Sequence, residues 1–355
     1  MNYKQKIYCI ATILLVLSLF CTIVILKNQY VYPLPTYAPK LPNSSSYIYT
    51  QTYDTSGQAV HPDILVFKNG YTNKLSKSYT YIMANTPIPN SDNSYEHPCI
   101  TVSIKANGSF VNDNIINPIR PTYHILDEEP KDYHLPYQAD PDILYVNQVF
   151  YLYWKTRESI LWEFYRQTSV DLINWTEAEQ CNVSGLLTTF HNQLSPAIIF
   201  DGIWKMWTCD KESHAVIYFE SVDGMNWIAK IKTDIPIPID YNSQSNVYAW
   251  HIDVQKLKKS NQYWAVISTL SDGGSCNLYF SASFNGKNWT TFATPLLNCS
   301  EYSWDNRLYR STFAIYQNKL MLWYSGISGL QIHIGYSEIE IGDIILEGEE
   351  SFNVH

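Results

Sequence analysis

The sequence predicts an all-β protein: a five-bladed β-propeller preceded by one N-terminal transmembrane helix. Three observations support this architecture. A short strand with a polar first residue occurs five times, a turn ending in Asn-Trp follows three of these strands, and helical periodicity is scarce after residue 27. We expect the anchor within residues 1–27, a linker over 28–46 and the propeller over 47–355.

The first predicted element is the membrane segment. Residues 7–26 are twenty consecutive positions without a charge, with Lys4 and Lys6 before them and Lys27 after them. At 1.5 Å rise per residue this segment is long enough to cross a bilayer. A cleaved signal peptide is the alternative, which would give a secreted protein, but no convincing small-residue cleavage site follows. We expect a single-pass protein of the cell membrane with its propeller outside the cytoplasm.

The linker and the cysteines come next. Residues 28–46 are rich in Pro, Tyr, Asn and Ser, which is typical of a linker. Two of the seven cysteines, Cys9 and Cys21, belong to the membrane segment, and the other five show neither CxxC nor zinc spacing. Most of them are expected to be buried free thiols. One disulfide outside the cell is left open.

The repeated unit combines two strands and a turn. Its first strand begins with a polar residue, and a second strand rich in aromatic residues follows. A β-meander of this kind cannot bury both of its faces alone, whereas radial packing of five copies can. An irregular β-sandwich is the structural alternative. The five strand heads are His61-Pro-Asp63, Asp140-Pro-Asp142, Ser195-Pro-Ala197, His251-Ile-Asp253 and Arg310-Ser-Thr312, and the turns are Ser169–Trp175, Ser221–Trp227 and Ser281–Trp289.

The composition of the 355 residues excludes two classes of protein. An apolar content of 46% excludes intrinsic disorder. A net charge of −9 without a basic stripe excludes a nucleic-acid binder of the usual kind. The aromatic content of 15% suits a β-rich protein whose rings stack on sugars.

Residues 140–154 together with 169–175 resemble a blade of the five-bladed propeller glycosidases, which include arabinanases, β-xylosidases, invertases and levansucrases. The likeness runs through all five units, roughly residues 58–338. It implies a glycoside hydrolase that acts on a cell-surface or extracellular polysaccharide without a cofactor. A non-catalytic glycan-binding or polysaccharide-assembly protein, and a glycosyltransferase or phosphorylase, remain alternatives on the same fold.

The candidate site lies where the first strands begin, because these strands line the channel of a propeller. Residues two apart on a strand share a side, so the polar heads project as pairs. A glycosidase needs one carboxylate as base or nucleophile and a second as acid. The catalytic candidates are Asp63, Glu96, Asp140 and Asp142, and the substrate-binding candidates are His61, Arg157, Ser195, Trp250, His251, Asp253 and Arg310. Alternatively, these groups cap strand starts or satisfy one another.

Two strand heads depart from the family pattern. The related glycosidases have their base or nucleophile where this chain has His61, and their acid near the position of Ser195, while their pKa-tuning aspartate matches Asp140. We expect Glu96 to act as the acid instead. His61 and His251 among aspartates also resemble a divalent-cation site, but satisfied structural histidines are commoner, so no metal is predicted.

Aromatic residues near the strand heads are expected to stack on sugar faces, whereas mid-strand rings belong to the core. Arg157 and Arg310 would suit an acidic or phosphorylated sugar, although pairing with neighbouring aspartates is the favoured interpretation. The expected partners are a carbohydrate substrate and, through residues 7–26, the membrane; the oligomeric state is not predicted. The candidate stacking rings are Tyr95, Tyr133, Tyr137, Trp154, Trp250, Trp304 and Tyr309.

Overall fold

A computed structural model describes residues 32–119, 137–157, 162–238, 247–271 and 277–355. The predicted membrane segment, residues 7–26, lies outside these ranges. Within them, no helix has both the length and the apolar character needed to cross a bilayer. Cys99, Cys181 and Cys209 are buried free thiols, whereas Cys299 is disulfide-bonded.

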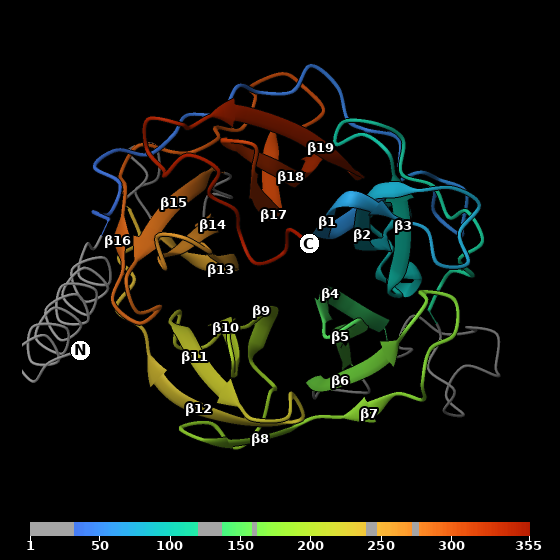
Figure 1. The fold of residues 1–355 in the computed structure, drawn as a ribbon, viewed down its shortest axis with the longest axis horizontal. Helices are drawn as coiled ribbons and strands as arrows, with labels where there is room; N and C mark the ends of the chain where they lie inside the picture. Colours follow the sequence, from blue (N-terminus) through green and yellow to red (C-terminus); the bar gives the residue numbers. More distant parts are fainter. Residues whose placement is uncertain (1–31, 120–136, 158–161, 239–246, 272–276) are drawn as a thin grey trace, which may run out of the picture. The chain divides into compact units, whose positions relative to one another are not determined.

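The described strands form five sheets arranged radially around a channel (Figure 1), as the repeat predicts. Each sheet is a blade, and its first strand is the innermost. Two short 3-10 helices, η1 (Pro89–Ser91) and η2 (Asn93–Tyr95), lie between β2 and β3. The strands are β1 (Ala59–Tyr71), β2 (Tyr79–Pro87) and β3 (Cys99–Ser103) in blade 1; β4 (Tyr137–Val146), β5 (Val149–Arg157), β6 (Trp162–Ser169) and β7 (Glu179–Gln180) in blade 2; β9 (Gln193–Phe200), β10 (Trp204–Asp210), β11 (Val216–Ser221), β12 (Asn226–Lys232) and β8 (Asn182–Gly185) in blade 3; β13 (Val247–Lys256), β14 (Tyr263–Ser271), β15 (Leu278–Ser283) and β16 (Thr290–Thr291) in blade 4; and β17 (Arg307–Tyr316), β18 (Lys319–Ser328) and β19 (Gln331–Glu340) in blade 5.

The repeated Asn-Trp motif is a structural turn. In blade 3 the Asp223 carboxylate accepts hydrogen bonds from the backbone N–H groups of Met225 and Asn226, both at 2.8 Å. A side chain that satisfies backbone donors in this way fixes a tight turn. The following Trp227 is fully buried and packs edge-on against Tyr153 of blade 2. The motif therefore ends strand β11 and contributes to the packing of blade 3 against blade 2.

The apolar core lies in layers between neighbouring blades. One layer joins Tyr153 and Phe164 of blade 2 to Met206 and Phe219 of blade 3. Equivalent layers join blades 1 and 2, blades 3 and 4, and blades 5 and 1. Most mid-strand aromatic residues are used here, because large rings fill the space between twisted sheets.

An N-terminal segment closes the ring on its outer side. The Ile48 N–H donates to the Ile334 carbonyl in blade 5 at 2.9 Å. In blade 1, the Phe110 N–H donates to the Tyr49 carbonyl at 2.9 Å, and the Gln51 N–H donates to the Phe110 carbonyl at 2.8 Å. Residues 48–51 thus bridge the first and last blades.

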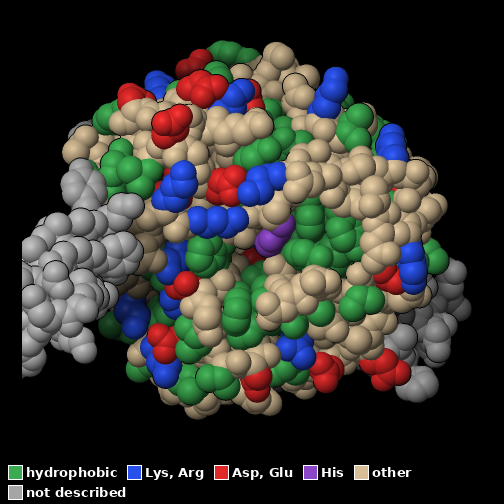
Figure 2. Space-filling model, in the orientation of Figure 1, with side chains coloured by type: hydrophobic (Ala, Val, Ile, Leu, Met, Phe, Trp, Pro, Cys, Tyr) green, Lys and Arg blue, Asp and Glu red, His purple; other side chains and the backbone are tan. Residues whose placement is uncertain are grey.

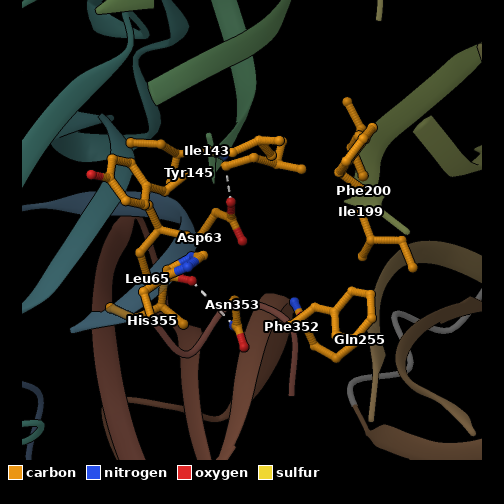
Figure 3. A pocket seen from close by; sticks show the side chains of 14 residues that line it. Asp63, Leu65, Ile143, Tyr145, Ile199, Phe200, Gln255, Phe352, Asn353 and His355 are labelled. Atoms are coloured by element: carbon orange, nitrogen blue, oxygen red, sulfur yellow. Dashed lines mark hydrogen bonds between the residues drawn. The ribbon is translucent and has the colours of Figure 1, made fainter. Parts of the chain in front are cut away.

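The C-terminal segment runs inside the ring of blades and ends beside β1 (Figure 1), at the end where the first strands finish. The His355 N–H donates to the Val66 carbonyl at 2.7 Å, and the Phe352 N–H donates to the Lys256 carbonyl at 2.9 Å. A cavity of about 50 Å³ remains between this segment and the channel wall (Figure 3), lined mainly by apolar side chains with Asp63 and Asn353. The space-filling view in the same orientation shows a hollow at the centre of the ring (Figure 2).

A tier of buried aspartates crosses the middle of the channel. Each accepts a hydrogen bond from a backbone N–H of the next blade: Asp63 from Ile143 at 2.6 Å (Figure 3), Asp142 from Ile198 at 3.1 Å, and Asp253 from Phe313 at 2.9 Å. The Thr312 hydroxyl also donates to Asp63 at 3.1 Å. These bonds connect blade 1 to 2, 2 to 3, 4 to 5 and 5 to 1.

Crowding and burial keep these carboxyl groups from ionising easily. Burial raises the pKa of Asp63 and, well above its usual range, that of Asp142, although the Arg310 charge opposes both changes. Burial, followed by the charge of Asp63, raises the pKa of Asp253 to about 7. The folded protein therefore holds a proton on Asp253 that the unfolded chain releases near pH 3.8.

This difference predicts a pH-dependent stability. Because the folded pKa is raised, the contribution of Asp253 is fully present below pH 4 and is lost as the pH rises to about 7. We expect the contribution of Asp253 to the free energy of unfolding to fall by roughly 2–4 kcal/mol over this range. It is measured by urea unfolding as the difference between wild type and Asp253→Asn, which keeps an acceptor for Phe313, and this difference should shift in favour of the variant as the pH rises from 4 to 7. The exposed control Glu301→Gln should behave as wild type, and an unchanged slope in Asp253→Asn would contradict the assignment.

Candidate functional site

The first strands begin with β-bulges that redirect their polar heads. The strand pairing shifts register at the head of every first strand. His61, Asp140 and Ser195 precede prolines and have φ values of 56°, 57° and 40°. A positive φ at a residue other than glycine is uncommon and costs energy, and such strain clusters at functional sites. A bulge also leaves a residue unpaired and re-aims its side chain.

His61 lies at the centre of the resulting cluster. Its Nε2 is 3.1 Å from Asp140 Oδ1, and its Nδ1 is 3.4 Å from Glu96 Oε2. Glu96 follows η2 in the loop between β2 and β3, so that blade 1 supplies both the histidine and the acid. The imidazole ring thus separates two carboxyl groups. All three residues are at most 5% exposed.

A serine and a second histidine complete the cluster. The Ser195 hydroxyl forms a short contact with His251 Nδ1. The Ser195 N–H donates to Asp140 Oδ2 at 3.3 Å, and the rings of His61 and His251 are 5.7 Å apart. The heads of blades 1 to 4 therefore meet at one end of the channel. Arg310, the head of blade 5, lies 3.9 Å from Asp140 and 4.0 Å from Asp142, between the cluster and the aspartate tier.

Asp140 is held as a carboxylate. Burial alone would raise its pKa, but the charge of Lys155, with Nζ 2.6 Å from Oδ2, together with that of Arg310, holds that pKa well below its usual range. Lys155 is absent from the sequence-predicted site. The signal that would have found it is a lysine within the strand Val149–Arg157 that directly follows six apolar or aromatic residues, 149–154.

Glu96 and His251 are shifted toward their neutral forms. Burial raises the pKa of Glu96 even though His61 opposes the change. Burial also lowers the pKa of His251 well below its usual range, despite the nearby charge of Asp140. The environments of Glu96 and Asp140 therefore separate two carboxyl groups into an acid and a base, the arrangement that hydrolytic enzymes use.

Some polar atoms of the cluster are buried without a hydrogen-bond partner among the described residues: His251 Nε2, and Nε and Nη1 of Arg310. Three more, His61 Nε2, Asp140 Oδ1 and Glu96 Oε2, form no well-aligned hydrogen bond, but both carboxylate oxygens lie within ion-pair distance of the His61 ring. Buried polar atoms are nearly always hydrogen-bonded, and leaving one unsatisfied is costly. Their concentration makes this end of the channel the candidate site for a polar ligand.

Aromatic rings border this end of the channel. The half-buried Tyr309 ring lies 4.3 Å from His251 and 5.6 Å from His61, and the indole N–H of Trp250 donates to its hydroxyl at 3.0 Å. Tyr95 is exposed, whereas Trp304 stacks on Tyr324. Trp154 is fully buried and therefore not available to a ligand. Tyr133 and the side chains of Tyr137 and Arg157 lie outside the described part of the structure.

The other predicted site residues, Asp63, Asp142 and Asp253, lie deeper, in the aspartate tier that joins the blades. In the part of the chain that the structure describes, no three side chains of His, Cys, Asp or Glu are placed to hold a metal ion. The ammonium group of Lys155 lies instead against Asp140.

No protein-family model and no curated protein matches this sequence. Solved structures do match. An N-acetylgalactosamine deacetylase from F. plautii, in complex with blood group B trisaccharide, is 19% identical with a TM-score of 0.66 over 88% of this chain and 97% of its own. A GH43 β-xylosidase/α-arabinofuranosidase from a compost microbial metagenome, in complex with xylotriose, is 11% identical with a TM-score of 0.53 over 79% and 91%.

A xylan β-1,4-xylosidase from Bacillus halodurans is 13% identical with a TM-score of 0.55, over 86% of this chain and 54% of its own. The resemblance to propeller glycosidases is thereby confirmed for the fold. This chain has the five-bladed architecture found in these carbohydrate-active enzymes.

Proposed function

We propose that this protein is a glycoside hydrolase that cleaves its substrate at the polar end of the channel. The observation that carries this proposal is the pair Glu96 and Asp140, which lie on either side of His61 with their pKa values shifted in opposite directions. The unsatisfied polar atoms around this pair support a hydroxyl-rich ligand, because hydroxyl groups both donate and accept hydrogen bonds.

In this mechanism Glu96, protonated because its pKa is raised, donates its proton to the leaving glycosidic oxygen. Asp140, ionised through Lys155 and Arg310, uses Oδ1, the oxygen that faces His61 Nε2, to activate water or to attack the anomeric carbon. Tyr309 and Trp250 would stack on a face of the sugar at the channel mouth.

Asp63 and Asp142 have a different role in this proposal. Both oxygens of Asp63 accept hydrogen bonds within the fold, and one oxygen of Asp142 accepts the Ile198 N–H. We therefore assign these two carboxyl groups to the joining of blades and the chemistry to Glu96 and Asp140.

Removal of an acyl group from a sugar is the second candidate function. The contact between Ser195 and a neutral His251 favours it, as does the similarity to an N-acetylgalactosamine deacetylase. His251 Nδ1 would take the hydroxyl proton while Ser195 Oγ attacks the acyl carbon, with Arg310 Nη1 and Nε free to stabilise the oxyanion. The proton would pass to the leaving sugar atom, and water would then release the acyl group as a carboxylate.

For the glycosidase, Glu96→Gln should lower sugar release at least 100-fold, because the variant has no proton to donate. Thermal unfolding and glycan binding should stay close to wild type. The wild-type rate should fall as the pH rises through the raised pKa of Glu96, and it should persist at acidic pH because Asp140 stays ionised. A glycan array identifies the substrate, and chromatography of the products measures the release of sugar. The variant Glu177→Gln, at an exposed position, is the control.

Full activity in Glu96→Gln would contradict this assignment. Binding by the wild type without release of product would favour the glycan-binding or polysaccharide-assembly alternative. Transfer of the sugar to phosphate or to another sugar would identify a phosphorylase or a glycosyltransferase.

Ser195→Ala separates the two hydrolytic functions. The Ser195 backbone N–H to Asp140 does not depend on the side chain, so a glycosidase should keep sugar release within about tenfold of wild type. A deacylase using Ser195 should lose roughly 1000-fold or more of its acetate release, because the nucleophile is gone. Parallel assays of reducing sugar and acetate on acetylated glycans measure both, and retained acetate release in the variant would rule out Ser195 as nucleophile.

We also propose that the propeller lies outside the cytoplasm, anchored by residues 7–26. The uncharged segment with basic flanks supports this location, as does the disulfide of Cys299, because disulfides persist mainly in oxidising compartments.

A reporter that is active only outside the cytoplasm tests the location. Alkaline phosphatase fused after residue 46 should be active and membrane-bound. The same fusion without residues 7–26 should be inactive. Activity of the fusion in the culture medium would indicate cleavage, and an inactive full fusion would contradict export.

A further inference from the structure

A second hollow, lined by polar and apolar residues, lies at the end of blade 3 that carries Ser195. Its volume is about 280 Å³, and its lining includes Leu187, Ile217, Thr189, Asn192, Asp210, Glu212 and Lys232. These residues come from the segment before β9, the end of β10 and the loop after it, the start of β11 and the end of β12. We call it the blade-3 groove.

The groove is held in shape by hydrogen bonds among its own residues. The Asn192 side-chain amide donates to Glu212 at 2.8 Å, and the Ser213 N–H donates to Asp210 at 2.6 Å. The Lys211 N–H donates to the Asn192 carbonyl at 2.8 Å, which ties the loop after β10 to the start of β9. Thr189, Asn192 and Glu212 remain exposed, so their polar groups are available to a ligand.

A line of aromatic contacts connects this groove to the cluster. Tyr309 lies against His61 and His251 and accepts the Trp250 indole N–H. Trp250 packs edge-on against Tyr248, and Tyr248 stacks on His214, which belongs to the same loop as Glu212. At its inner edge the groove includes Gln193, two residues before Ser195.

We infer that the blade-3 groove is a second sugar subsite, so that a bound oligosaccharide extends from the channel over blade 3. This inference rests on the proposed carbohydrate-active function. Amide and carboxylate groups pair with sugar hydroxyls, and the aromatic line borders the space between the two positions.

The charge of the groove sets the class of sugar. Two carboxylates, Asp210 and Glu212, face one amine, Lys232. An acidic sugar would meet repulsion there, whereas a neutral or amino sugar would not. The subsite therefore selects neutral or amino sugars.

The test compares how tightly the full-length protein binds sugars of different length. A glycan array of neutral, amino and uronic sugars first identifies the trisaccharide that binds most tightly. Calorimetry then measures the binding of this trisaccharide and of the monosaccharide unit from it that occupies the channel. Wild type should bind the trisaccharide at least tenfold more tightly than the monosaccharide. Thr189→Tyr, which fills the groove, and the double variant Asn192→Ala/Glu212→Ala should remove most of this difference and leave monosaccharide binding unchanged. Glu177→Gln, an exposed glutamate on blade 2, should match wild type.

The outcomes separate the subsite from the proposed function. If groove variants keep the full length dependence while sugars still bind, the subsite is refuted and the proposed function stands. If the trisaccharide that binds best is uronic, the assigned sugar class is wrong. If wild type binds no sugar on the array, the proposed function fails and the subsite fails with it.

Discussion

The hydrogen bond from a channel aspartate to the backbone of the next blade is the contact on which the rest of the structure depends. Five separate sheets share no ladder, and apolar packing between them has little direction of its own. The bonds from Asp63, Asp142 and Asp253 to Ile143, Ile198 and Phe313 fix how neighbouring first strands are aligned. Blade 3 has Ala197 at the equivalent position, so it donates the Ile198 N–H to blade 2 but has no carboxylate there to accept a bond from blade 4.

The channel contains two layers of polar groups that differ in how well their hydrogen bonds are satisfied. In the deeper layer, each carboxyl group finds a backbone donor and becomes part of the scaffold. In the layer above, bulges turn His61, Asp140 and Ser195 away from regular pairing, and several buried polar atoms are left without partners. Unsatisfied buried polar atoms and backbone strain both reduce the stability of the upper layer. The hydrogen bonds of the lower layer therefore have to offset this loss.

The repeat in the sequence is enough to predict the blades, because the strand heads and Asn-Trp turns recur in order. It also identifies Glu96 and Asp140, which head or follow strands in that repeat. The sequence predicts the relation of His61 to Asp63 less well. Strict alternation along a strand would point both side chains to the same side at the same level. The bulge between Val60 and Asp63 instead puts His61 in the cluster and Asp63 in the aspartate tier. Lys155 is not predicted from the sequence, because it lies within a second strand and not at a strand head. Its ion pair with Asp140 in the structure shows that it belongs to the cluster.

The C-terminal segment leaves the candidate site with one approach through the described residues. Phe352 and His355 bond to the inner strands at the end of the channel opposite the cluster. A ligand that comes from the other end meets the polar strand heads first and the aspartate tier behind them. It would enter and leave by that same end of the channel.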